Sequence, residues 1–220
     1  MSAQGKVTLL DYGMCNMLNV ARAFQHVGAE LTMTADPREA AAAERLVVPG
    51  VGAFGDSIAE LRRRGHDEAI RAFAETGRPL LGICVGMQVL FEGSDEFGHH
   101  AGLGLLGGWV KPVPDRDDSG GSLLLPHIGW SHLLPPADRP DAWRDSLLAP
   151  MEGQNPAVYF VHSFAAVPAD PAVRLADCVY GGHRLSAAVR WQNITATQFH
   201  PERSGEAGLA MLAQFIATAR

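Results

Sequence analysis

The first half of the chain alternates short apolar runs with segments of helical periodicity. Four runs have the composition of strands: Lys6–Asp11, Ala29–Thr34, Leu46–Val48 and Pro79–Ile83. Five segments have the pattern of helices: Asn16–Val27, a segment starting at Asp36-Pro37, 55–64, 67–76 and Val85–Phe91. This alternation is typical of a parallel sheet covered by helices on both faces. The sequence therefore predicts an α/β fold.

From Trp109 onward the pattern changes to closely spaced strand candidates, with little helix until a final helical segment at about 206–219. Such spacing is typical of antiparallel strands at the edge of a mixed sheet. We expect a mostly parallel, mixed central sheet flanked by helices, with an antiparallel region in the second half. Two polar stretches, Pro114–Ser122 and Pro135–Pro150, are interpreted as surface insertions. Without repeats or low-complexity tracts, residues 1–220 are expected to form a single domain.

The composition excludes several classes of protein. The 220 residues are 47% hydrophobic and carry a formal charge of −6, so neither disorder nor nucleic-acid binding is expected. The three cysteines are far apart and show no CxxC spacing, which argues against a disulfide framework and a metal site. No segment has the pattern of a signal peptide or a membrane span. We expect a cytoplasmic protein without a membrane partner, a metal or a cofactor.

The pentapeptide Gly82-Ile83-Cys84-Val85-Gly86 follows an apolar run and precedes a helical pattern. Hydrolases place a nucleophile at such a strand-to-helix turn, where a strained backbone requires small flanking residues. The start of the helix favours a thiolate, and the Val85 N–H would face an oxyanion. A buried structural cysteine is the alternative interpretation. Cys15 and Cys178 lack this context.

A cysteine nucleophile needs a base, and His200-Pro201-Glu202 supplies a candidate. A strand candidate, Ile194–Phe199, ends just before His200. Proline favours extended backbone at His200, so the side chains of His200 and Glu202 would project to the same side. Glu202 would then orient one ring nitrogen and leave the other for the thiol. A surface turn is the alternative. Among the other histidines, His162 at the end of a strand candidate is the second choice for this pocket.

The segment Pro49-Gly50-Val51-Gly52-Ala53-Phe54 ends another strand candidate, at the same edge of the predicted sheet. Glycines there permit close backbone approach and could aim a second N–H at the oxyanion. A phosphate loop is the weaker interpretation, because the spacing matches neither common phosphate-binding pattern.

Together, PGVGAF, GICVGMQ and QFHPERSG resemble the class I (triad) glutamine amidotransferases. DYGMCNMLNV, PHIGW and YFVHSF are similar to one branch of that family, the glutaminase subunits of imidazole glycerol phosphate synthase in histidine biosynthesis. These matches run in order from residue 11 to about 205. The resemblance implies hydrolysis of L-glutamine to glutamate and ammonia, with Cys84 as nucleophile, His200 as base and Glu202 as its orienting group.

The resemblance also implies roles for residues around the triad. Backbone N–H groups of Val51, Gly52 and Val85 would form the oxyanion hole. Glutamine would be held by a second set of residues: Gly50, Gly86, Gln88, Glu96, His162, Ser163 and Phe164. Glu96 would pair with the α-ammonium group of the substrate.

The chain contains no candidate site for an ammonia acceptor. The resemblance supplies a partner, a (βα)₈-barrel cyclase subunit that forms a heterodimer with this chain and receives the ammonia. Trp130 and Arg203 match family positions at that interface, and both residue types are enriched in interfaces. Cys15, Phe164 and Arg203 depart from the usual family residues, which are glycine, tyrosine and lysine.

Two alternatives remain at this point. The chain could serve another acceptor enzyme, such as pyridoxal-phosphate synthase, although PGVGAF and PHIGW argue against it. It could instead be a catalytically silent regulatory module, although all three triad candidates are present.

Overall fold

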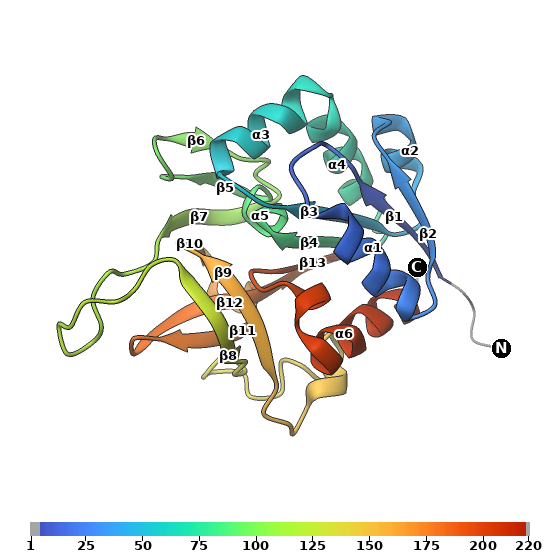
Figure 1. Cartoon of the computed structure of the whole chain (residues 1–220). Coiled ribbons are helices and arrows are strands. Elements are labelled where there is room, and N and C mark those ends of the chain that lie inside the picture. The colour runs from blue at the N-terminus through green and yellow to red at the C-terminus, as the bar shows by residue number, and fades with distance from the viewer. Residues whose placement is uncertain (1–4, 219–220) are drawn as a thin grey trace.

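The computed structural model describes residues 5–218 as an α/β fold built on a seven-stranded sheet (Figure 1). The strand order is β11-β12-β13-β4-β3-β1-β2. Residues 1–4 and 219–220 of the expected domain lie outside the described residues, as does the last residue of the expected final helix. Within the described range, no helix is long and apolar enough to cross a membrane.

The parallel part of the sheet carries the strands that the first half of the sequence predicts. It consists of β1 (Lys6–Leu10), β2 (Glu30–Thr34), β3 (Leu46–Gly50), β4 (Leu80–Cys84) and β13 (Ile194–Thr197). Every residue of β3 and β4 is buried, as expected for central strands covered on both faces. At one edge, β12 (His183–Trp191) and β11 (Arg174–Tyr180) continue the sheet in antiparallel pairing.

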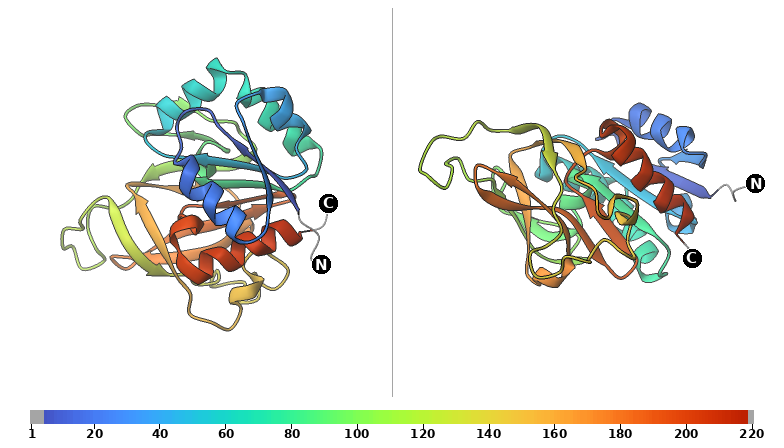
Figure 2. Two further views of the ribbon diagram at one scale, coloured as in Figure 1. Left: turned by 45° about the vertical axis from the view of Figure 1, so that its right-hand side comes forward. Right: turned by 90° about the horizontal axis from the view of Figure 1, so that it is seen from below.

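Helices cover both faces of this sheet (Figure 1, Figure 2). On one face lie α1 (Met17–His26) and α6 (Gly205–Ala217), joined by an edge-to-face contact of Phe24 with Phe215 at 6.1 Å. On the other lie α2 (Pro37–Ala42), α3 (Phe54–Arg63) and α4 (His66–Glu75). The predicted start of α2 at Asp36-Pro37 is confirmed, and the Asp36 carboxylate caps the helix by accepting the Arg38 N–H at 2.8 Å.

The second half of the chain adds two small sheets. One contains β5 (Phe91–Ser94), β6 (His100–Ala101), β7 (Leu106–Pro112) and β10 (Phe164–Pro168). The other pairs β8 (His127–His132) with β9 (Ala157–His162) in antiparallel register. The expected antiparallel region is therefore confirmed. Part of it supplies the walls of the site described below.

The helix expected over Val85–Phe91 is wrong in its length, since α5 (Val85–Gln88) has four residues. The helix ends early because the segment after β6 forms hydrogen bonds with the carbonyl groups that would continue it. N–H groups of Leu103 and Leu106 take the carbonyl oxygens of Val89 and Leu90 at 2.8 and 3.0 Å, and Phe91 begins a strand instead.

Two expected boundaries also differ from the structure. The strand at Leu46–Val48 continues through Pro49 and Gly50, which stay in register with Ile83 and Cys84 of β4. In contrast, β13 ends at Thr197, two residues before the expected end at Phe199.

The polar stretch Pro135–Pro150 is not wholly a surface insertion. Its Trp143, Leu147 and Leu148 are buried, and the Trp143 indole N–H donates to the Leu175 carbonyl in β11 at 2.9 Å. Apolar side chains in a polar stretch thus close one end of the core. The stretch Pro114–Ser122 protrudes as a loop beyond β7 and β8, as expected (Figure 1).

Candidate active site

Cys84 stands at the junction between β4 and α5, with φ of 56° and ψ of −115°. A positive φ is strained for any residue with a β-carbon, and such strain is typical of functional sites. A β-carbon at Gly82 would lie 2.8 Å from the Gly86 carbonyl oxygen, so the first glycine of the pentapeptide is needed for the turn. The sharp strand-to-helix turn expected from the sequence is confirmed.

The second glycine of the pentapeptide, Gly86, has even less space for a side chain. A β-carbon at Gly86 would lie 1.9 Å from the Val48 carbonyl oxygen of β3, and one at Gly50 would lie 2.6 Å from the Gly86 nitrogen. The first turn of α5 therefore rests directly on the end of β3. This contact brings the segment after β3, with Val51 and Gly52, beside Cys84.

His200 and Glu202 are paired by a hydrogen bond of 2.8 Å between Nδ1 and Oε1. Both side chains are buried, with exposed fractions of 7% and 2%. His200 is extended as predicted, but Glu202 lies in a 3₁₀ turn, Pro201–Arg203, which places it behind the imidazole ring. The buried Nε2 of His200 has no hydrogen-bond partner among the described residues.

The environment of His200 favours its protonated form. Burial lowers the pKa of His200, but interactions with Cys84 and with Glu202 outweigh it and raise the pKa to about 10. At neutral pH His200 is therefore an imidazolium that can give a proton to a group in the pocket.

The other two cysteines, Cys15 and Cys178, are held as neutral thiols. Burial, followed by the carboxylate of Asp11, raises the pKa of Cys15 to about 12, and burial with Asp177 does the same for Cys178. Since the thiolate is the reactive form, neither cysteine competes with Cys84 as a nucleophile.

Cys84 and His200 line one pocket of about 170 Å³. The other residues that line it are Val51, Gly52, Val85, Gln88, Glu96, Val161, His162, Ser163 and Phe164. Of these, Val161 was not predicted from the sequence. Gly50, Gly86 and Glu202 do not line the pocket; the two glycines lie beneath Cys84 and Glu202 lies behind His200.

A larger cavity of about 560 Å³ lies near the amino ends of β4 and β13, lined by residues such as Leu80 and Thr195. Its lining contains neither cysteine nor histidine. The smaller pocket is at the carboxyl ends of the strands, where open α/β sheets bind their ligands.

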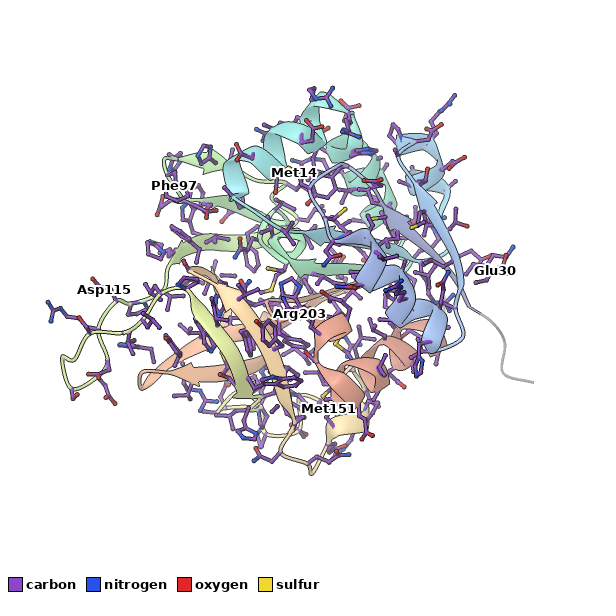
Figure 3. The ribbon with its side chains drawn as sticks, viewed as in Figure 1. Met14, Glu30, Phe97, Asp115, Met151 and Arg203 are labelled. Atoms are coloured by element: carbon purple, nitrogen blue, oxygen red, sulfur yellow. The ribbon has the colours of Figure 1, made fainter. Side chains whose placement is uncertain are left out.

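The pocket residue Glu96 is followed by an exposed aromatic residue, Phe97, which contacts the pocket residue Phe164. The Glu96 Oε2 accepts the N–H of Phe54 at 2.6 Å, which holds the carboxylate at the start of α3. Phe97 has a positive φ of 52°, is 87% exposed at the tip of the β5–β6 hairpin, and contacts the Phe164 ring edge-on at 6.3 Å (Figure 3).

Two contacts in this region were missed in the sequence. Gln198 is fully buried, and its Nε2 lies 3.7 Å from the Cys84 sulfur. The buried His127 is hydrogen-bonded to His162 at 3.1 Å. Burial lowers the pKa of His162 to about 4, so this imidazole is neutral. Gln198 could have been found from its spacing. It lies two residues before His200, and residues two apart in an extended segment project to the same side.

Trp130 and Arg203 lie close together on the surface, although they are far apart in the sequence. Trp130 is 58% exposed and contacts Tyr159 edge-on at 6.1 Å, and the guanidinium of Arg203, labelled in Figure 3, stacks over the same ring at 4.1 Å. The Tyr159 carbonyl accepts the N–H of His200 at 3.0 Å. This surface cluster is therefore attached to the backbone that carries the candidate base.

Comparison with known proteins agrees with this geometry. Residues 8–219 match the family described as glutamine amidotransferase class-I. The chain is 46% identical to imidazole glycerol phosphate synthase subunit HisH 1 of Legionella pneumophila (strain Lens) over 96% of this chain and 98% of the relative. It is 45% identical to the HisH subunit of Rhodopirellula baltica over 95% and 96%.

Among solved structures, PurLQS from Thermotoga maritima superposes with a TM-score of 0.68, covering 97% of this chain and 98% of that one. At 20% sequence identity this similarity shows the shared fold alone.

The chain therefore belongs to the class-I glutamine amidotransferases, and within them to the HisH subunits of imidazole glycerol phosphate synthase. This membership makes it an enzyme rather than a silent module. It also sets aside the alternative of a pyridoxal-phosphate synthase subunit.

The close contact between α5 and β3 leaves no space for a methyl group at Gly86, so adding one should destabilise the fold. We expect Gly86→Ala to lower the free energy of unfolding by about 3 kcal/mol, because the new β-carbon overlaps the Val48 carbonyl. Urea unfolding followed by circular dichroism measures it. The matched control is Gly107→Ala, where a β-carbon would lie 3.7 Å from Ala169 and change stability by about 0.5 kcal/mol or less. Equal midpoints for the two variants would contradict this account of the turn.

Proposed function

We propose that this chain hydrolyses the side-chain amide of L-glutamine with a catalytic triad of Cys84, His200 and Glu202. The observation that carries the proposal is that Cys84 and His200, remote in sequence, line one pocket while Glu202 holds the far nitrogen of the imidazole. Within the family, this is the chemistry that releases ammonia for a synthase. The reaction needs no metal or cofactor.

In the first step the Cys84 thiolate attacks the amide carbon. The negative charge then moves to the carbonyl oxygen, where the Val85 N–H at the start of α5 would stabilise it. The N–H of Val51 is already bonded to the Met14 carbonyl at 2.9 Å. Gly52 has φ of 90° and no β-carbon to oppose rotation, so we assign the second oxyanion N–H to the Val51–Gly52 peptide after it turns.

Collapse of the tetrahedral intermediate breaks the C–N bond. The His200 imidazolium gives its proton to the departing nitrogen, which leaves as ammonia and a γ-glutamyl thioester on Cys84. His200, now neutral, takes a proton from water as the water attacks the thioester. Glutamate leaves, and the thiolate and imidazolium are restored.

The remaining pocket residues are assigned to substrate binding. Glu96 presents a carboxylate at the mouth of the pocket and would pair with the α-ammonium group. Gln88 and the segment His162–Phe164, with Ser163, would contact the rest of the amino acid. Gly50 and Gly86 would contribute from outside the pocket lining, since a β-carbon at either would clash with the contact between α5 and β3 that carries Cys84.

Ammonia is mostly protonated at neutral pH and ammonium is not a nucleophile, so the product needs a protected route. We propose that the partner is the cyclase subunit of the synthase, a (βα)₈ barrel that forms a heterodimer with this chain in the cytoplasm. Trp130 and Arg203 would lie in the interface, together with the exposed Ile128 on the same strand as Trp130. Docking there would touch the strand whose Tyr159 holds the backbone of His200.

The nucleophile is tested by Cys84→Ala in the complex with the cyclase subunit. We expect glutamine-dependent synthesis to fall at least about a thousandfold, while synthesis from added ammonium salt stays at the wild-type rate. The control is Cys15→Ala, which removes the half-buried thiol after β1 and keeps both activities. Glutamine turnover that survives Cys84→Ala would refute the assignment.

The role of Glu202 is tested by the pH dependence of glutamine hydrolysis. With the pKa of His200 raised to about 10, the leaving group keeps its proton donor through neutral pH, and the rate falls only as pH approaches that value. In Glu202→Gln one cause of the raised pKa is lost, so this fall should move down by about 1–3 pH units. Glu68→Gln, on the exposed surface of α4, is the control. If the rate of Glu202→Gln falls at the same alkaline pH as that of the wild type, Glu202 is not a member of the triad.

A further inference from the structure

Gln198 lies between β13 and His200, and its side chain is buried from solvent. Its Nε2 faces the Cys84 sulfur at 3.7 Å, and its Oε1 accepts a hydrogen bond from the Nε2 of Gln88 at 3.0 Å. Neither the triad nor the pocket lining includes this residue.

The orientation of both amides follows from one backbone carbonyl. The Phe164 oxygen lies 3.1 Å from the Gln88 side-chain nitrogen, and a carbonyl oxygen only accepts hydrogen bonds. Gln88 must therefore present its NH₂ group, and its second N–H points at Gln198. Gln198 is then fixed with its oxygen toward Gln88 and its NH₂ toward the sulfur.

The same carbonyl is held from its other side by a histidine pair. His162 donates its Nδ1–H to the Phe164 oxygen at 2.9 Å, so its Nε2 is the acceptor for the Nδ1–H of His127 at 3.1 Å. His127 Nε2 in turn accepts the hydroxyl of Ser131 at 2.9 Å. Two donors thus fill both acceptor positions of the Phe164 oxygen and fix its direction.

We propose that Gln198 is a positioning residue that donates an N–H to the Cys84 sulfur and stabilises its thiolate, oriented through Gln88 by the Phe164 carbonyl. This inference rests on the proposed role of Cys84 as the nucleophile. An amide donor carries no charge and gives up no proton. The sulfur is therefore stabilised by a group that does not compete with His200 for the proton that the leaving ammonia needs.

The same hydrogen bonds connect the glutamine pocket to the sulfur of Cys84. Phe164 lines the glutamine pocket, and its carbonyl sets the direction of the amide at the sulfur. The hydrogen-bonded chain from Ser131 to Cys84 begins next to Trp130, on the exposed strand β8. A partner that moves β8 would therefore act on the same donor.

The test measures the pH dependence of alkylation of Cys84 by iodoacetamide in the intact chain, read by mass spectrometry of the Cys84 peptide. Gln198→Met keeps the length of the side chain and removes the donor. We expect the apparent pKa of the Cys84 thiol to rise by about one unit, which makes alkylation about tenfold slower at pH values below the wild-type midpoint. The two titratable groups that face Cys84, His200 and Tyr12, are unchanged in this variant, and the pKa of Tyr12 is raised far above neutral by burial.

Gln25→Met, on the exposed face of α1, is the matched control and should keep the wild-type profile. A second variant, Gln198→Glu, keeps the shape and places a carboxylate at the sulfur, so it should raise the same pKa at least as much. Profiles of both Gln198 variants that superimpose on the wild type would overturn the proposal.

Because alkylation uses no glutamine, this result is independent of the proposed reaction. A shifted profile together with an active Cys84→Ala variant would keep the hydrogen bond and refute the catalytic role of Cys84. An unshifted profile together with an inactive Cys84→Ala variant would keep the nucleophile and refute the role of Gln198.

Discussion

The architecture of the site depends on the close approach of α5 to the end of β3. Gly86 meets the Val48 carbonyl with no room for a methyl group, and Gly50 meets the Gly86 backbone in the same way. This contact holds Cys84 in a backbone conformation that costs about 1–3 kcal/mol in isolation. It also sets the oxyanion segment after β3 beside the sulfur. The contact between α5 and β3 therefore explains both the backbone strain at Cys84 and the position of the oxyanion segment beside it.

Around this fixed point, each reactive group is held by specific side-chain and backbone partners. Glu202 holds the imidazole of His200, and Tyr159 holds the same residue's backbone. Gln198 faces the sulfur from a buried position, with its direction set by Phe164. Since Tyr159 and Ser131 belong to the two-stranded sheet that bears Trp130, the surface proposed for docking is connected to both the base and the nucleophile.

The parts of the site that depend on neighbouring residues in the sequence were predictable. The turn at Cys84 follows from two glycines between a strand and a helix, and the His200–Glu202 pair from their spacing around proline. Contacts that depend on the tertiary fold were not predictable. These are the hydrogen bond from the Leu103 N–H to the Val89 carbonyl, which ends α5 early, and the contact of the Gln198 amide with the Cys84 sulfur. Burial of Trp143 within a polar stretch was missed for the same reason, because its partner lies in β11.

The central claim is that glutamine hydrolysis passes through a covalent bond to Cys84. The direct measurement is acid quenching of the complex with the cyclase subunit during glutamine turnover, followed by mass spectrometry of its cysteine peptides. The account predicts a γ-glutamyl adduct on the Cys84 peptide and none on the Cys15 or Cys178 peptides, whose thiols have a raised pKa. An adduct on either of those cysteines, or steady turnover with no adduct on Cys84, would contradict it.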